Sequence, residues 1–194
     1  GSWPMYESAT VGGALRLANV LKVAAQKAGW GTKKLPPNTA MGIAVSSAEE
    51  RQSPTWVAGI AEVTVDPATG NVKINRLTIA MDMGIAVNPM NIKAQIQGSA
   101  LWGASQILSE KLTLKNGAFE QTNFHEYMPI RLENIPQIDV EIVQSQRHPS
   151  GVGEPASTVV APAVANAIFN AVGSRVRQMP ITAEAVLKGM SKKA

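Results

Sequence analysis

Apolar residues near the start of the chain recur at spacings of three and four, the pattern of one helical face. They lie within residues 12–28 and comprise Ala14, Leu17, Ala18, Leu21, Ala24 and Ala25. Gly29 follows as a C-cap, and residues 31–38 contain Pro36 and Pro37, which cannot continue a helix. The pattern predicts a helix followed by a linker.

Three short stretches have the pattern of strands. Residues 41–45 are apolar, and in residues 55–65 apolar side chains alternate with others. The sequence Asp-Pro-Ala-Thr-Gly at 66–70 supplies the residues of a turn, and residues 72–81 return as a strand. The last two strands are therefore predicted to form a hairpin.

Helical spacing returns after a predicted loop at residues 82–89. The face of this second helix, predicted over residues 91–108, is formed by Ile92, Ile96, Ala100, Gly103 and Ile107. It also carries the small residues Gly98 and Ser99. Small side chains permit another element or a ligand to approach closely, so we expect a close contact on this helix.

Similar patterns of strands, turns and helices occur in the second half of the chain. Residues 111–114 precede an Asn-Gly pair at 116–117, which predicts a second hairpin, and alternation at 138–142 predicts a strand that runs towards Ser145. A further helix is expected over residues 159–172, and Gly173 follows it. Pro162 fits that helix only near its first turn. A short final helix is expected over residues 181–190.

This mixture of hairpins and helices, without an internal repeat, predicts the α+β class, with mixed or antiparallel sheets and packed helices. We divide the chain into residues 1–40, an N-terminal helix and linker, and residues 41–194, the main lobe. With 194 residues, 45% of them hydrophobic, the chain can bury a sizeable core. Its longest apolar stretches fall short of the roughly 20 residues of a membrane span, so we expect a soluble chain.

Composition excludes several functions. The chain has no Cys, so it has no disulfide and no thiolate ligand for zinc or an iron–sulfur cluster. The net charge of +4 comes from scattered Lys and Arg residues without interleaved aromatic residues. This favours a solvated surface over nucleic-acid binding. His125 and His148 lack the spacing of metal ligands, so no metal site formed by side chains is predicted.

The tract Gly151-Val152-Gly153-Glu154-Pro155 is the main candidate for chemistry, because its glycines let the backbone approach a ligand. Its carboxylate has two interpretations. The local pattern favours an acidic residue that complements a helix N-terminus. The alternative is a general base desolvated by Val152, Val159 and Val160. Gln95 and Gln97 are amides on a predicted helix, and solvated glutamines are the usual interpretation.

Several blocks, taken together, resemble a known family, and the similarity covers nearly everything from Gly42 to Pro180. The blocks are residues 81–89, 94–98, 123–127, 151–155 and 160–169. They resemble the end of the large, molybdopterin-binding subunit of the xanthine dehydrogenase and aldehyde oxidase family. The bacterial isoquinoline 1-oxidoreductase and membrane-associated aldehyde dehydrogenase branch is the most similar. The resemblance implies the C-terminal lobe of a molybdopterin-binding domain.

The resemblance also implies a site and a reaction. It implies that Glu154 is the general base that takes a proton from a molybdenum-bound hydroxyl, while an aldehyde or N-heteroaromatic substrate is oxidised with oxygen from water. It assigns Gln95, Val152 and Gly153 to the molybdopterin cofactor, expected in its cytosine dinucleotide form. Gln97 replaces the acidic residue common at its position, and we assign it no role. Residues 156–158, Ala-Ser-Thr, replace the family's frequent Gly-Thr-Pro.

Large subunits of this family are several times longer, so we expect a fragment that is inactive alone. Its expected partners are the remaining N-terminal part of the large subunit, a [2Fe-2S] subunit, a cytochrome c acceptor and a small-molecule substrate, but no nucleic acid. A periplasmic or membrane-associated location is expected, with a cytoplasmic one left open. The alternative is a non-catalytic assembly domain that keeps the fold without the cofactor.

Overall fold

The computed structural model describes residues 14–50 and 53–190 and is built around a four-stranded sheet of order β1-β2-β3-β6. The strands are β1 (Thr39–Glu50), β2 (Ser53–Val65), β3 (Val72–Asp82) and β6 (Gln137–Ile142). The first three are antiparallel neighbours, whereas β6 runs parallel to β3. The sheet is therefore mixed, and the predicted α+β class is confirmed.

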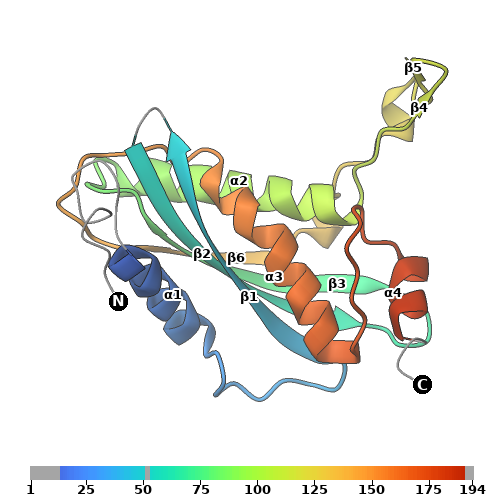
Figure 1. Cartoon of the computed structure of the whole chain (residues 1–194), viewed down its shortest axis with the longest axis horizontal. Helices are drawn as coiled ribbons and strands as arrows, with labels where there is room; N and C mark the ends of the chain where they lie inside the picture. Colours follow the sequence, from blue (N-terminus) through green and yellow to red (C-terminus); the bar gives the residue numbers. More distant parts are fainter. Residues whose placement is uncertain (1–13, 51–52, 191–194) are drawn as a thin grey trace.

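Helices cover both faces of this sheet (Figure 1). They are α1 (Ala14–Ala28), α2 (Pro89–Leu108), α3 (Pro155–Val172) and α4 (Ala183–Met190). Val20 and Ala24 of α1 pack against a strand face that includes Trp56, Ala58 and Ile60. The opposite face includes Val57, Ala61, Val63 and Ile79 and packs against α2 and α3. Because side chains alternate between the two faces of β2, they pack into two separate hydrophobic cores.

α3 crosses the sheet directly over β1, an edge strand. A Cβ atom added to Gly42 would lie 2.1 Å from the carbonyl oxygen of Ala163, so only glycine permits this crossing. The amides of Asn166 and Asn170 donate to β1 carbonyl oxygens, at 3.1 Å and 2.9 Å. These bonds give partners to carbonyls of a strand that has a sheet neighbour on one side only.

The predicted start of the third long helix was wrong. α3 begins at Pro155 instead of residue 159, with a proline in its first turn as helices favour. Pro162 therefore lies about two turns inside the helix and not near its first turn. Pro162 removes the N–H partner of the Thr158 carbonyl. Both residues lie on the exposed side of α3, so the Thr158 carbonyl is not sealed in the core without a partner.

α3 is also long and apolar enough to cross a membrane by length and composition, which the sequence pattern did not suggest. Here its apolar side packs into the main core, through Val159, Val160, Ala163 and Val164 among others. Core helices often meet the same criterion, so the helix is weak evidence for membrane insertion.

Most other expected elements are found, with shifted ends. The hairpin of β2 and β3 is confirmed, and β1 extends well beyond residue 45 because its pairing with β2 continues to Glu50. α2 begins at Pro89, two residues before the predicted start, because Asn88 caps it. The described part of the first helix begins at Ala14, while the predicted residues 12–13 lie outside the described ranges.

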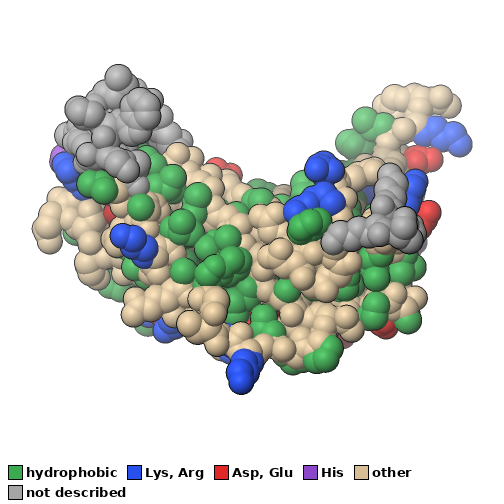
Figure 2. Space-filling model, turned by 60° about the horizontal axis from the view of Figure 1, so that its bottom comes forward, with side chains coloured by type: hydrophobic (Ala, Val, Ile, Leu, Met, Phe, Trp, Pro, Cys, Tyr) green, Lys and Arg blue, Asp and Glu red, His purple; other side chains and the backbone are tan. Residues whose placement is uncertain are grey.

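The second hairpin is shorter than predicted. It consists of β4 (Leu114–Lys115) and β5 (Ala118–Phe119), so residues 111–113 are not part of a strand. Asn116 and Gly117 both have positive φ, of 51° and 81°, as the predicted two-residue turn requires. The hairpin projects from the body of the molecule (Figures 1 and 2).

Candidate functional site

Two loops meet at one edge of the sheet because β3 and β6 are parallel neighbours that end side by side. Residues 83–88 follow β3, and residues 143–154 follow β6. The N–H of Ile85 donates to the carbonyl of Arg147 at 2.9 Å, and the N–H of Ser150 donates to the carbonyl of Met83 at 2.8 Å. In open α/β sheets, ligands bind beyond the carboxyl ends of parallel strands, which makes the end of this parallel pair a candidate site.

Gly84 allows the two loops to approach closely. Its φ is +81°, and an added Cβ atom would lie 2.1 Å from the carbonyl oxygen of His148. Both the conformation and the space therefore favour glycine at this position.

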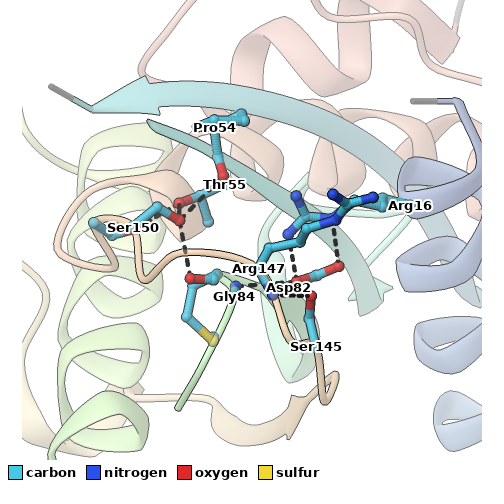
Figure 3. A network of polar contacts seen from close by, with 10 residues as sticks. Arg16, Pro54, Thr55, Asp82, Gly84, Ser145, Arg147 and Ser150 are labelled. Atoms are coloured by element: carbon cyan, nitrogen blue, oxygen red, sulfur yellow. Dashed lines mark hydrogen bonds and ion pairs between the residues drawn. The ribbon is translucent and has the colours of Figure 1, made fainter. Parts of the chain in front are cut away.

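A chain of hydroxyl groups holds the second loop against β2 (Figure 3). The buried Thr55 lies 2.6 Å from Ser150 between their side-chain oxygens, and its hydroxyl donates to the Gly151 carbonyl at 2.7 Å. Ser150 Oγ also lies 3.1 Å from the carbonyl oxygens of Pro54 and Met83. These contacts fix the backbone just before Gly153 and Glu154.

An ion pair holds the start of the first loop (Figure 3). Arg16 of α1 donates through Nε and Nη2 to the two carboxylate oxygens of Asp82, at 2.7 Å and 2.6 Å. Asp82 also accepts the Gly84 N–H at 3.1 Å. Because only 4% of the Asp82 side chain is exposed, the carboxylate depends on these donors in place of water.

Between α2 and these loops lies a cavity of about 270 Å³ that brings Gln95 and Val152 together. Its other walls are mainly apolar and include Met83, Ile85, Val87 and Ile92. The Gln95 side chain is exposed and has no hydrogen bond to any other described residue. One acceptor and two donors of its amide are thus available to a ligand.

Glu154 occupies the N-cap position of α3, next to this cavity along the chain but outside its lining. The carboxylate is exposed and makes no cap hydrogen bond. The expectation that Val152, Val159 and Val160 would desolvate it is not met by the described residues. Val159 and Val160 are buried in the core because α3 starts early and turns them inward.

The backbone of Glu154 is held firmly. Its carbonyl oxygen accepts hydrogen bonds from Ser99 Oγ at 3.0 Å, Ser157 Oγ at 2.8 Å and the Ser157 N–H at 3.0 Å. Ser99 follows Gln95 by four residues on α2, so both lie on one side of that helix. α2 therefore links the cavity amide to Glu154.

Gly153 leaves its surroundings open. It is exposed, and an added Cβ atom would meet no atom of the described residues within 4 Å. The backbone beside Glu154 is therefore accessible to a ligand.

Sequence reasoning missed Arg16, Thr55, Ser99 and Ser150 as parts of this site. Only Ser99 had a signal, because it belongs to the run of small residues predicted to permit close approach. That prediction is confirmed at Gly103, where an added Cβ atom would lie 3.0 Å from the Cβ atom of Val160 on α3.

A second cavity and the arrangement of the acidic and histidine side chains were considered as alternative sites. A larger cavity, of about 410 Å³, lies at the C-terminal end of α2 and is lined by Val72, Leu108 and Met128 among others, but by none of the predicted site residues. Within residues 14–50 and 53–190, no group of three or more His, Asp or Glu side chains is arranged to hold a metal ion.

Comparison with known proteins places these features in a family. Residues 17–136 match the molybdopterin cofactor-binding domain. The chain is 46% identical over 181 residues to the membrane-bound aldehyde dehydrogenase (pyrroloquinoline-quinone) of Gluconacetobacter polyoxogenes, an alignment that covers 93% of this chain and 23% of that protein. It is 29% identical over 166 residues to the isoquinoline 1-oxidoreductase subunit beta of Brevundimonas diminuta, which covers 86% of this chain and 21% of that subunit.

The fold also matches solved structures. The aldehyde oxidoreductase from Desulfovibrio gigas superimposes with a TM-score of 0.59 and 28% identity, over 72% of this chain and 16% of that one. The chain thus spans less than a quarter of the length of the relatives described here.

Proposed function

The chain belongs to the molybdopterin cofactor-binding domain family, and from this premise we propose that it is part of a molybdenum hydroxylase that oxidises an aldehyde or N-heteroaromatic substrate with oxygen from water. The observation that supports this most is the cavity shared by Gln95 and Val152, with Glu154 two residues after Val152 on the same loop. The names of the relatives supply the two substrate classes.

The residues of the cavity fit a molybdopterin. A pterin presents hydrogen-bonding edges on a flat ring, and the cavity offers the available amide of Gln95 between apolar walls. The open backbone at Gly153 permits close approach, with Val152 beside it. Because the pterin dithiolene holds the metal, a cluster of protein ligands is not needed. When bound, the cofactor supplies the redox chemistry.

Glu154 is the proposed general base. Its carboxylate has no partner among the described residues, while its backbone is fixed by Ser99 and Ser157. It therefore takes up a proton at a carboxylate oxygen as the substrate is oxidised.

The proposed assembly contains the remaining N-terminal part of the large subunit, a [2Fe-2S] subunit and a cytochrome c acceptor. The short span of the chain relative to its relatives supports the first partner. The lack of Cys supports the second, because iron–sulfur clusters need thiolate ligands. We propose the cytosine dinucleotide form of the cofactor and a periplasmic or membrane-associated location. The latter is supported by the name of the aldehyde dehydrogenase relative.

Substitution of Glu154 in the complete enzyme tests the proposed base. We expect Glu154→Gln to lower kcat at least about a hundredfold, the contribution of a positioned base, with unchanged molybdenum content. Glu184→Gln is the matched control, since Glu184 is another exposed glutamate near the start of a helix, in the first turn of α4. Normal turnover of Glu154→Gln with full molybdenum content would show that the base is another group.

Cofactor analysis tests the alternatives. A non-catalytic assembly domain predicts an assembled complex without molybdenum or pterin. One relative is named for pyrroloquinoline quinone, which predicts that quinone in place of molybdopterin. Metal and pterin analysis of the purified complex distinguishes a molybdenum hydroxylase, an assembly domain without cofactor and a quinone enzyme. A stoichiometric molybdenum content supports the proposed function.

A further inference from the structure

We propose that Ser99 is a positioning residue for Glu154, and that its hydroxyl sets where the Glu154 carboxylate lies relative to the Gln95 cavity. This inference rests on the proposed function of Glu154. The hydroxyl donates to the Glu154 carbonyl at 3.0 Å and accepts the Ser157 N–H at 3.0 Å. Ser99 thus joins α2 to the N-cap residue of α3, Glu154, and to its third residue, Ser157.

The hydroxyl is enclosed by these partners. Only 3% of Ser99 is exposed, so its polar atom must find its hydrogen bonds within the protein. Four residues after Ser99, Gly103 brings α2 against Ser157, whose Cα atom would lie 3.1 Å from a Cβ atom added to Gly103. The helices therefore touch at the level of the Glu154 backbone, and the Ser99 hydroxyl is the polar contact in this junction.

Because Ser99 lies on the same helix as Gln95, its bond to Glu154 also fixes the distance between Glu154 and the Gln95 cavity. Gln95 and Ser99 lie on one rigid helix, about one turn apart, so the amide that faces the cavity and the group that holds Glu154 move together. The backbone of residue 154 determines where its side chain begins. A shift of α3 along α2 would therefore displace the carboxylate from a ligand held at Gln95.

Loss of the hydroxyl should not prevent α3 from forming. Ser157 donates twice to the Glu154 carbonyl, through its N–H and its hydroxyl, and both bonds remain in Ser99→Ala. The start of the helix keeps its local bonds, while its link to α2 is lost. We therefore expect an effect on turnover that exceeds the effect on folding.

Three variants of the complete enzyme test the proposal: Ser99→Ala, Ser105→Ala and Ser99→Ala combined with Glu154→Gln. Ser105 is the matched control, because it is another buried serine of α2 whose hydroxyl accepts a backbone N–H, from Ile130. We expect Ser99→Ala to lower kcat by about tenfold or more while KM changes little, since small misplacements of a catalytic group cost this much. Ser105→Ala should keep the kcat of the wild type.

A second readout does not depend on turnover. Hydrogen exchange of the Ser157 amide reports this contact, because its N–H is shared between Ser99 Oγ and the Glu154 carbonyl. Ser99→Ala removes one of the two acceptors, so we expect this variant, but not Ser105→Ala, to accelerate the exchange. Unchanged exchange, or equal kcat values in Ser99→Ala and Ser105→Ala, would overturn the positioning role.

The double variant separates this proposal from the proposed function. If Ser99 acts through the carboxylate, Ser99→Ala should have no further effect on kcat once Glu154→Gln is present. A full additional loss in that background overturns the inference while the role of Glu154 stands. Normal turnover of Glu154→Gln alone instead refutes the proposed function, and the role of Ser99 with it.

Discussion

The Arg16 guanidinium and the Asp82 carboxylate form a two-point ion pair between α1 and the end of β3, with N–O distances of 2.7 Å and 2.6 Å. The pair joins residues that are 66 positions apart. Because Asp82 also accepts the Gly84 N–H, α1 contributes to the position of the loop that lines the Gln95 cavity. The first helix is thus structurally connected to the candidate site.

Arg16→Met tests this connection. The substitution leaves the Asp82 carboxylate buried with the Gly84 N–H as its remaining described donor, so we expect a loss of roughly 3 kcal/mol in unfolding free energy. Urea denaturation of the chain measures it. Lys27→Met is the control. The Lys27–Glu141 pair is much more exposed, so its removal should leave the urea midpoint unchanged. Equal midpoints for Arg16→Met and Lys27→Met would contradict a structural role for the buried pair.

Gly42 and Gly98 should respond in opposite ways to alanine. At Gly42 a Cβ atom would lie 2.1 Å from the Ala163 carbonyl, so α3 must shift, and we expect a loss of about 3 kcal/mol. At Gly98 a Cβ atom meets no described atom within 4 Å, and alanine in α2 should gain about 0.5–1 kcal/mol. Thermal unfolding of both variants measures the predicted loss of stability in Gly42→Ala and the predicted gain in Gly98→Ala. A stable Gly42→Ala variant would show that α3 does not pack this closely on β1.

The hairpin of β2 and β3 could be predicted because its information is local. Alternation along residues 55–65 marks the buried positions, and the turn at 66–70 lies between the strands. The end of α3 was equally clear, since Gly173 adopts the left-handed conformation of a C-cap. Its start was missed because the prediction placed the first helical residue at Val159, although proline favours the first turn of a helix and Pro155 begins α3.

Contacts between segments that are far apart in the sequence could not be predicted in this way, because no local sequence pattern indicates them. Nothing in the sequence around Arg16 indicates Asp82 as its partner, and the parallel pairing of β6 with β3 follows from the path of the chain through α2. At Glu154 the sequence neighbours were misleading. Val159 and Val160 are close in sequence, but the helix turns them into the core and leaves the carboxylate exposed.

Acidification should open the turn at residues 122–126. The backbone N–H groups of Thr122 and Asn123 and the Thr122 hydroxyl donate to the Glu126 carboxylate and hold its pKa below the usual value of about 4.3. A lowered pKa in the folded state stabilises the turn above that usual value, and the stabilisation is lost as the pH falls through the lowered pKa. The amide resonances of Thr122 and Asn123 report the transition.

Glu126→Gln provides the control for this titration. Its neutral amide cannot ionise, so the resonances of Thr122 and Asn123 should no longer follow the same acid transition. If both amides of the unsubstituted chain titrate at or above the usual glutamate value, the donated hydrogen bonds do not favour the carboxylate.

Gln95 and Gln97 lie two residues apart on α2, yet only Gln95 lines the cavity next to Glu154. Gln97 is directed to the other side, where its amide donates to the Ile138 carbonyl at 3.4 Å. We expect Gln95→Leu to weaken cofactor binding about tenfold, the effect of one lost hydrogen bond, and Gln97→Leu to leave it unchanged. Molybdenum per chain, measured in complexes assembled under limiting cofactor, provides the comparison, and circular dichroism confirms that both variants fold. An equal loss of molybdenum in the two variants would mean that α2 affects the cofactor through general packing. A loss confined to Gln95→Leu would identify the amide in the cavity as the contact.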